Sequence, residues 1–193
     1  MRSVDELRHA LATHTPQLLV GRRRAAVTVV LHDRPGDPAL LFIERARRGG
    51  DPWSGQMAFP GGRLSPRDPD ARAAALRETQ EEVGLDLRDA EPLGQLHDLQ
   101  AGVRVVSPLV LSAFVYRVEA PPPLTLNHEV QHAFWVPAST LTNPAHRVDH
   151  RWGPGRFPGI LVGEPDRHVV WGLTYQLLGQ LFALVGTPPP IAE

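Results

Sequence analysis

Apolar residues recur along this chain in two rhythms, and these rhythms predict its first elements. Within residues 4–14 the apolar positions follow helical spacing, which predicts a short amphipathic helix. Residues 25–31 form a run rich in β-branched side chains, which is typical of a buried strand, and residues 39–45 are expected to form a second strand. A turn containing two prolines and a glycine separates the two runs, so we expect a β-hairpin.

The same patterns divide the remainder of the chain. Further strands are expected over residues 56–59, 93–99, 103–118 and 129–136. Pro108 lies inside the third of these runs and predicts an edge, a bulge or a break, because proline cannot donate to a strand ladder. Residues 137–141 are expected to form a short turn or helix, and the strongly apolar segment 169–185 the last helix. The tail from residue 187 to 193 is expected to be loose.

A more polar helix is expected between the strands at 56–59 and 93–99. Asp68 suits its N-cap, Pro69 its first helical position and Gly84 a left-handed C-cap. A step of about 100° per residue divides this helix into two faces. One face carries Leu76, Thr79 and Val83, and the other carries Glu78, Glu81, Glu82, Ala74 and Ala75.

The composition is that of an ordinary globular protein, with 42% hydrophobic and 21% charged residues among 193. A formal net charge of −1 gives no overall field that would attract nucleic acid or an anionic membrane. The absence of cysteine excludes disulfides, thiolate metal ligands and a cysteine nucleophile. No apolar run reaches the length of a membrane span and the first residues lack a secretory signal, so we expect a cytoplasmic protein. Because the sequence shows no repeat and no long linker, a single domain over residues 1–193 is the simplest interpretation.

The acidic face of the expected helix is the strongest chemical signal. Glu78, Glu81 and Glu82 place three carboxylates on one face, where like charges repel unless a cation offsets them. Arg77 can pair with Glu81 one turn on, but one arginine cannot neutralise three glutamates. Mg²⁺ or Mn²⁺ can, since hard cations take oxygen ligands and are completed by substrate phosphates. The alternative is a solvated acidic face that binds nothing.

The residues around this helix resemble a known motif. Residues 77–85, RETQEEVGL, match the second half of the Nudix box, Gly-x5-Glu-x7-Arg-Glu-U-x-Glu-Glu-x-Gly-U, in which U is bulky and apolar. Thr79 is polar where the box has an apolar residue. In the first half, the acid counted from Gly62 is Asp68 rather than glutamate, and one extra residue precedes the arginine, so that counting back from it reaches Pro69.

The chain thus resembles Nudix hydrolases, and the resemblance implies a fold, a reaction and a site. The implied fold is α/β, an α/β/α sandwich around a mixed β-sheet. The implied reaction is hydrolysis of a nucleoside diphosphate linked to another group, with Mg²⁺ or Mn²⁺ as cofactor. Glu78 and Glu82 correspond to the main metal ligands, and the carbonyl of Gly61 to an additional one. Glu81 corresponds to a further ligand or to the general base, and Arg77 to the residue that orients Glu81.

A second motif narrows the substrate. Residues 41–46 and 55–62 resemble the coenzyme A pyrophosphatase branch of the family, whose motif has the form L-L-T-x-R-[SA]-x3-R-x3-G-x3-F-P-G-G. This chain has one extra residue between the two halves, and Asp51 stands where the second arginine of the motif falls. Three later segments also resemble that branch, namely residues 129–137, 157–160 and 170–174.

The resemblance to this branch implies hydrolysis of coenzyme A to 3′,5′-ADP and 4′-phosphopantetheine. Substrate contacts are then expected from Arg45, Arg47, Arg48, Phe59 and Gly62. The arginines suit this task because their planar forks match phosphate oxygens, and coenzyme A carries an additional 3′-phosphate. The alternatives are a salt bridge at the strand end for Arg45 and a core position for Phe59.

Two other functions stay open at this point. One is a Nudix diphosphatase acting on ADP-ribose, a nucleotide sugar or a dinucleotide. The other is a non-catalytic nucleotide-binding module, against which the three intact glutamates argue. In each case the partner is a small molecule rather than nucleic acid or a membrane, and a homodimer is an open option. The nine histidines show no metal-binding spacing, and Glu129 is the best acid outside the helix for a general base, although strand-end solvation is its simpler interpretation.

Overall fold

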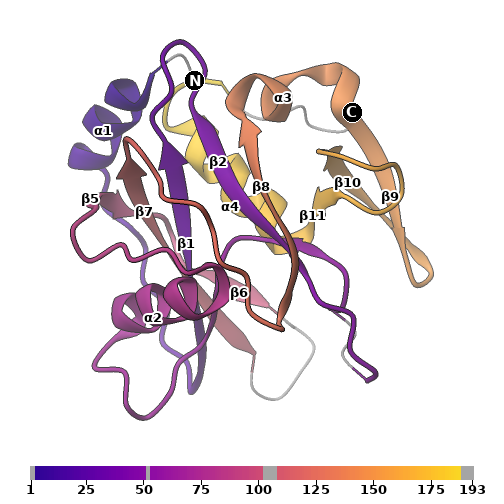
Figure 1. The fold of residues 1–193 in the computed structure, drawn as a ribbon, viewed down its shortest axis with the longest axis horizontal. Coiled ribbons are helices and arrows are strands. Elements are labelled where there is room, and N and C mark those ends of the chain that lie inside the picture. Colours follow the sequence, from indigo (N-terminus) through magenta and orange to yellow (C-terminus); the bar gives the residue numbers. More distant parts are fainter. Residues whose placement is uncertain (1–2, 51–52, 102–107, 188–193) are drawn as a thin grey trace.

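The computed structural model describes residues 3–50, 53–101 and 108–187, and Figure 1 shows their arrangement. The strands are β1 (Arg23–His32), β2 (Ala39–Arg45), β3 (Met57–Ala58), β4 (Gly61–Arg63), β5 (Glu91–Gln95), β6 (Leu99–Ala101), β7 (Leu109–Val118), β8 (Val130–Pro137), β9 (Arg147–Trp152), β10 (Gly155–Leu161) and β11 (Val169–Trp171). The helices are α1 (Val4–Thr13), α2 (Ala71–Val83), α3 (Ala138–Thr142) and α4 (Gly172–Ala183), and a 3-10 turn covers Pro144–His146. Within these described ranges, no helix is long and apolar enough to cross a membrane.

Strand β1 lies inside a mixed sheet of eight strands. It pairs antiparallel with β2 and β4, and parallel with β7 along all of its ten residues. On one side β2 continues to β3 and β8, and on the other β7 continues to β5 and β6. A second sheet contains three antiparallel strands in the order β11-β10-β9. The hairpin predicted for the first two strands is confirmed.

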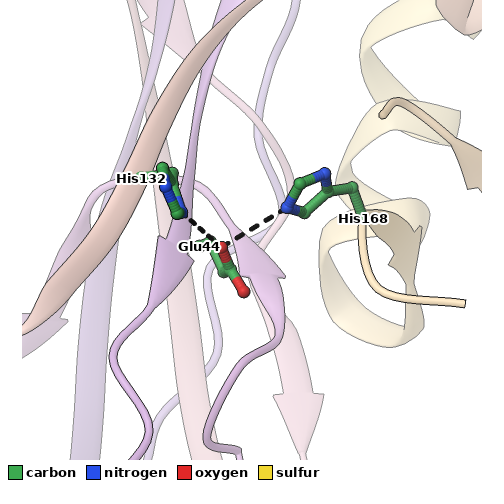
Figure 2. Close-up of side chains that lie close together, drawn as sticks. All are labelled: Glu44, His132 and His168. Carbon is green, nitrogen blue, oxygen red and sulfur yellow. Dashed lines mark hydrogen bonds and ion pairs between the residues drawn. The ribbon is translucent and has the colours of Figure 1, made fainter. Parts of the chain in front are cut away.

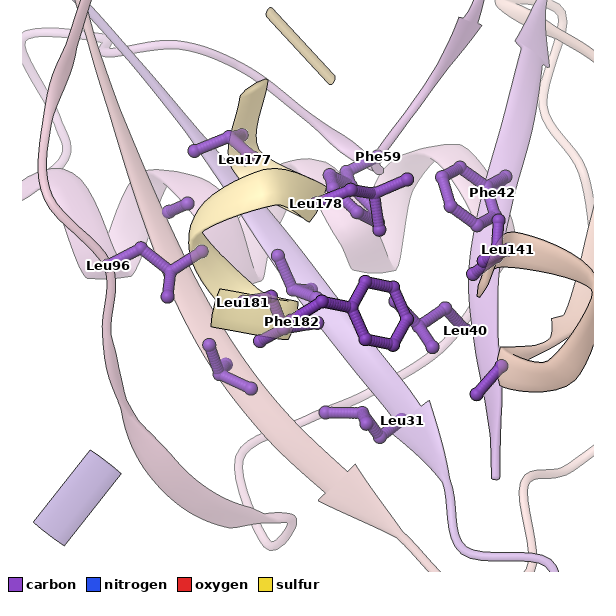
Figure 3. Packing of buried hydrophobic residues seen from close by; sticks show 14 of the residues in the cluster. Leu31, Leu40, Phe42, Phe59, Leu96, Leu141, Leu177, Leu178, Leu181 and Phe182 are labelled. Atoms are coloured by element: carbon purple, nitrogen blue, oxygen red, sulfur yellow. The ribbon is translucent and has the colours of Figure 1, made fainter. Parts of the chain in front are cut away.

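Helices cover both faces of the large sheet (Figure 1). Helix α2 lies on one face, where Val83 at its end packs in a cluster with Val30, Ile43 and Tyr116. Helices α1 and α4 lie on the other face and contribute to the larger of the two core clusters. Figure 3 shows the α4 side chains of this cluster packed among those of the sheet: Leu177, Leu178, Leu181 and Phe182. The predicted α/β/α arrangement around a mixed sheet is confirmed.

Strand β2 shows why its sequence is continuously apolar. Successive side chains of a strand point to opposite faces, and both faces are covered here. Leu40 and Phe42 join the cluster under α4, whereas Leu41 and Ile43 join the cluster under α2. The side chains near the end of this strand therefore face two different parts of the molecule.

Three boundaries differ from those expected from the sequence. The strand expected over 93–99 is two strands, β5 and β6. The last helix begins only at Gly172, because residues 169–171 form β11 and Gly172 has a φ of 62°, a left-handed conformation that redirects the chain. Strand β7 begins directly after Pro108. The earlier part of that expected strand and nearly all of the tail expected to be loose lie outside the described residues.

Candidate active site

The two ends of helix α2 are capped by Asp70 and Gly84. The Asp70 carboxylate accepts the backbone N–H of Ala73 at 2.7 Å, and Gly84 has a φ of 70°, the left-handed conformation that ends many helices. The predicted C-cap is confirmed. The predicted N-cap at Asp68, with Pro69 as the first helical residue, is wrong by two residues, because the Asp68 carboxylate has a different partner.

That partner is Arg77. Its Nε and Nη2 atoms donate to the two oxygens of Asp68, each at 2.9 Å, and these bonds hold the pKa of Asp68 below its usual value. The Nη1 atom of Arg77 also lies 2.8 Å from Glu78 and 3.1 Å from Glu81. The predicted Arg77–Glu81 pair is therefore confirmed. Asp68 therefore supplies an acidic partner for Arg77, although the chain has one residue more than the Nudix box between this acid and the arginine.

Thr79, the polar residue at an apolar position of the box, is fully buried against β1. Its hydroxyl donates to the backbone carbonyl of Ala75 at 2.7 Å and lies 2.7 Å from the hydroxyl of Thr28. Since the Thr79 hydrogen points to the carbonyl, the Thr28 hydroxyl donates to Thr79. A hydrogen-bonded pair of threonines thus joins the helix to the sheet at this point.

Gly61 and Gly62 are the first residues of β4, where the chain turns from β3 into β4, and they bring this turn into direct contact with the acidic helix. The N–H of Gly61 donates to Oε2 of Glu82 at 2.8 Å. Gly61 has a φ of 148°, and a Cβ added there would lie 2.3 Å from the carbonyl oxygen of Ala26. A Cβ added to Gly62 would lie 2.5 Å from the carboxyl carbon of Glu78. Gly61 is therefore required by its backbone conformation and by the close approach of β1, and a side chain at Gly62 would displace the carboxylate of Glu78.

Burial changes the acidity of these two glutamates. Glu82 is 2% exposed, and burial raises its pKa to about 7 although the N–H of Gly61 acts in the opposite direction. Burial also raises the pKa of Glu78, against the opposing effect of Arg77. A buried carboxylate that is costly to ionise is stabilised when it binds a proton or a metal cation.

Burial in α2 does not follow the two faces expected from the sequence. Glu82, Ala74 and Ala75, which share a face with Glu78 and Glu81, are buried, and Leu76 on the other face is only partly buried. For Glu82 the cover comes from the turn at 61–62, whose approach to the helix the periodicity alone could not indicate.

The loop after β2 carries the predicted basic residues. Arg48 binds Glu129 through Nη1 and Oε1 at 3.0 Å. The Ser54 hydroxyl accepts the backbone N–H of Arg48 at 2.8 Å and donates to its carbonyl at 2.9 Å, which closes the loop. Arg47 lies across the same loop, with Nε 3.5 Å from the position of a Cβ on Gly55. The structure thus groups Arg47 and Arg48 on one loop and gives Arg48 an acidic partner.

Arg45 and Glu129 lie within electrostatic reach of the acidic helix. Besides burial and the Gly61 bond, the charge of Arg45 lowers the pKa of Glu82 and the charge of Glu129 raises it. Glu129 precedes β8, in a segment where the Asn127 N–H donates to the backbone carbonyl of Glu82 at 3.0 Å. The loop after β2 and the loop before β8 therefore meet near the end of α2.

Phe59, the aromatic residue of the predicted substrate contacts, lies in the core. It is 2% exposed and its ring stacks on Phe42 with a centroid separation of 4.8 Å (Figure 3). The structure therefore gives Phe59 the core position that the sequence left open, while a substrate contact by this residue stays a prediction.

A further group of side chains, which the sequence did not indicate, meets at the end of β2 (Figure 2). Glu44, His132 and His168 have ligand atoms that all lie within 4.8 Å of one another. Nδ1 of His132 lies 2.8 Å from Oε2 of Glu44, and Nε2 of His168 lies 3.4 Å from the same oxygen. The histidines are 88 and 124 residues from Glu44 along the chain, so no motif spacing could reveal the group.

A surface hollow of about 530 Å³ lies near the other end of α2. Its lining includes Arg24, Asp70, Arg72 and Phe114. None of the three helix glutamates lines it, so it is separate from the acidic site.

The chain matches the NUDIX domain family over residues 22–154. It is 34% identical over 175 residues to the human protein named mitochondrial coenzyme A diphosphatase NUDT8, a match that covers 86% of this chain and 71% of that protein. It is 40% identical over 117 residues to an uncharacterized protein of Schizosaccharomyces pombe, but spans only 34% of that protein's length. A crystal structure of a MutT/nudix family protein from Enterococcus faecalis shares the fold, with a TM-score of 0.55 and 16% identity over 95% of this chain and 74% of that chain.

This family match, together with the acidic helix and its glycine turn, assigns the class of protein: the chain belongs to the Nudix family. It is accordingly an enzyme of the Nudix hydrolases rather than a non-catalytic binding module. Hydrolases of this family in general require divalent metal ions. The human relative, of which the match covers 71%, bears the name of a coenzyme A diphosphatase.

Proposed function

We propose that this enzyme hydrolyses the diphosphate of coenzyme A, giving 3′,5′-ADP and 4′-phosphopantetheine. The main support for this substrate is the 34% identity, over 86% of the chain, to a relative named as a coenzyme A diphosphatase. The motif residues before the helix support the same substrate, since they form the turn that contacts Glu78 and Glu82. The products follow from cleavage of the P–O–P bridge of the coenzyme.

Mg²⁺ or Mn²⁺ is the proposed cofactor, held by Glu78, Glu82 and the carbonyl of Gly61. The donor set fits such a cation, because the ligands are oxygens and the buried Glu82 carboxylate has a raised pKa that a positive charge would lower. The bound metal would neutralise charge on the diphosphate during hydrolysis.

Glu81 is the proposed general base, and Arg77 is proposed to orient it. The pair is 3.1 Å apart, and Glu81 is the most exposed of the three helix glutamates, so it can reach a water molecule in the site. The water oxygen forms a bond to one phosphorus, the bond from that phosphorus to the bridging oxygen breaks, and the water proton passes to Glu81. Asp68 supports this role by fixing the guanidinium of Arg77 from the other side.

The proposed substrate contacts come from the loop after β2 and from the turn at Gly62. Arg45 acts near Glu82 and is proposed to bind the diphosphate, while Arg47 and Arg48 are proposed to bind the 3′-phosphate. The Arg48–Glu129 pair then opens when a phosphate takes the place of the carboxylate. This assignment rests on the charge of the three arginines and on their position beside the acidic helix.

Incubation of the protein with coenzyme A and Mg²⁺ or Mn²⁺, followed by mass spectrometry, tests the proposal. We expect equimolar 3′,5′-ADP and 4′-phosphopantetheine, and no products without metal. The departure at Asp51 from the branch motif makes ADP-ribose, nucleotide sugars and dinucleotides the comparison substrates. Rapid turnover of one of these with no products from coenzyme A would contradict the proposed substrate and leave the Nudix chemistry intact.

The cytoplasmic location and the homodimer option stay predictions. The name of the human relative places that protein in mitochondria, which is a statement about the relative alone. Size-exclusion chromatography with light scattering measures the oligomeric state directly.

A further inference from the structure

Arg167 completes the group around Glu44 and occupies both of its oxygens. It donates from Nε to Oε1 at 2.8 Å and from Nη2 to Oε2 at 2.9 Å. A carboxylate with two imidazoles is a donor set that also binds transition metals. A cation here would have to displace the guanidinium, so we interpret the group as a complete network of ion pairs and hydrogen bonds.

The hydrogen-bond directions determine the charges in this network. Nδ1 of His168 accepts the backbone N–H of Glu164 at 2.9 Å, so its Nε2 carries the proton and points to Glu44. Burial alone would raise the pKa of Glu44, but the hydrogen bonds from Arg167 and His132 outweigh burial, and the pKa lies below its usual value. Glu44, whose side chain is 1% exposed, is therefore an ionised carboxylate with its oxygens satisfied.

Glu44 and Arg45 are adjacent in sequence but face opposite sides of the sheet. The even-numbered apolar residues of β2 pack under α4 and the odd-numbered ones under α2, so alternation places Glu44 toward α4 and Arg45 toward α2. The backbone N–H of Arg45 also donates to the carbonyl of Gln56 at 3.0 Å, which holds this residue beside the segment that leads to Gly61. The pairing of β2 with β8 shifts register between the two residues, so the ladder alone does not fix Arg45.

The network joins three segments at this irregular point. Glu44 belongs to β2 and His132 to β8, while Arg167 and His168 belong to the turn that leads into β11. Figure 2 shows His132 and His168 reaching Glu44 from two sides. Removal of the Glu44 charge would weaken the side-chain contacts that join the end of β2 to β8 and to the turn before β11.

We propose that Glu44 is a positioning residue, which holds the end of β2 through Arg167, His132 and His168 so that Arg45 presents its guanidinium to the diphosphate. The inference rests on the proposed function in that it takes the site on α2 to bind a diphosphate. It does not depend on which nucleotide carries that diphosphate. Glu44 itself touches no substrate in this account and acts through its neighbour.

The test is a double-mutant cycle on binding of methylenediphosphonate, a diphosphate that cannot be hydrolysed, measured by calorimetry in Mg²⁺. Arg45→Gln is expected to weaken binding about tenfold, the size of one charge-assisted hydrogen bond. Glu44→Gln is expected to weaken it about three- to tenfold, and Glu44→Gln/Arg45→Gln no more than Arg45→Gln alone. Arg167→Lys, which keeps the charge but loses the fork, is the milder second variant and is expected to act in the same direction.

Arg117→Gln is the matched control. Arg117 also forms a partly buried network, bonding Asp33 at 2.8 Å and Glu91 at 3.0 Å, at the end of the sheet where β1 and β7 finish. The substitution Arg117→Gln should lower the melting temperature without changing the affinity for the diphosphate. Wild-type affinity in folded Glu44→Gln and Arg167→Lys, or losses that multiply in the double mutant, would overturn the inference. Zn²⁺ binding that His132→Ala removes would also overturn it, since the group would then be a metal centre.

If the inference holds but coenzyme A is not the substrate, the double-mutant cycle still shows coupling between Glu44 and Arg45, and the assay detects no products from coenzyme A. If coenzyme A is cleaved and the cycle shows no coupling, the proposed function stands and the positioning role does not. The two results are therefore distinguishable.

Discussion

At the scale of single residues, Glu82 shows how burial and chemistry are linked. Its carboxylate is covered by the turn at Gly61, accepts one backbone N–H and has a pKa of about 7 instead of 4.5. Because the pKa in the folded protein is raised, the associated stability is present below pH 4.5 and is lost as the pH rises through 7. In metal-free protein this change amounts to about 3 kcal/mol at most.

Glu82→Gln should therefore change activity and stability in opposite directions. Turnover should fall by several orders of magnitude, because a proposed metal ligand is lost. The metal-free variant should gain stability relative to wild type as the pH rises from 5 to 8, and Mg²⁺ or Mn²⁺ should stabilise the wild type but not the variant. Urea denaturation across this pH range, with and without metal, is the measurement. Near-normal turnover in the variant would contradict the ligand assignment.

The Thr28–Thr79 pair gives a second prediction at this scale. Thr79→Val leaves the buried Thr28 hydroxyl without its acceptor and should cost about 1–3 kcal/mol in the free energy of unfolding. Thr28→Val/Thr79→Val should cost less than Thr79→Val alone, because neither side then carries an unpaired polar group. Denaturant titration of Thr28→Val, Thr79→Val and the double variant measures the coupling, and simple additivity would contradict the hydrogen bond between the two threonines.

At the scale of elements, two aspartates precede helix α2 and have different roles: Asp70 caps the helix, and Asp68 binds Arg77. Asp70→Ala removes the N-cap and should cost about 1 kcal/mol of stability while leaving activity below the melting temperature unchanged. Asp68→Asn weakens the hold on Arg77 and should lower kcat about ten- to a hundredfold, with the helix intact by circular dichroism. The opposite assignment of the two effects would support the N-cap at Asp68 that the sequence predicted.

The elements themselves could largely be predicted because their patterns are local. The hairpin of β1 and β2, the helix α1 and the C-cap at Gly84 depend on periodicity and on single residues with special backbone freedom. The N-cap at Asp70, the burial of Glu82 and the break at Gly172 depend on contacts with segments that lie elsewhere in the chain. The periodicity of the helix contains no information on the segment at Gly61 that covers Glu82, so the burial of Glu82 could not be predicted from it.

The residues of the candidate site likewise divide into those that the sequence could predict and those that only the fold reveals. Glu78, Glu81, Glu82 and Arg77 could be named from one helical segment. The bond between Asp68 and Arg77 could be inferred only by tolerating one extra residue in the motif. The Glu44–Arg167 network has partners from three distant segments and became visible only in the folded chain.

At the scale of the whole molecule, elements outside the family match complete the core. The match covers residues 22–154, yet α1 buries Val4, Leu7 and Leu11, and α4 fills the face of the sheet opposite α2. The turn before β11 also supplies Arg167 and His168 to the end of β2. The acidic helix and the loop after β2 are thus supported by segments that lie on both sides of the matched region. That these segments form one domain stays a prediction.

The central claim is that this Nudix enzyme prefers coenzyme A, and comparison of kcat/KM values at one fixed Mn²⁺ concentration tests it most directly. The substrates are coenzyme A, its analogue without the 3′-phosphate, and ADP-ribose, each with wild type and with Glu82→Gln. We predict that coenzyme A has the highest kcat/KM, that loss of the 3′-phosphate lowers it about tenfold or more, and that Glu82→Gln lowers turnover of every substrate by several orders of magnitude. A higher kcat/KM for ADP-ribose, or equal values for coenzyme A with and without the 3′-phosphate, would contradict the account.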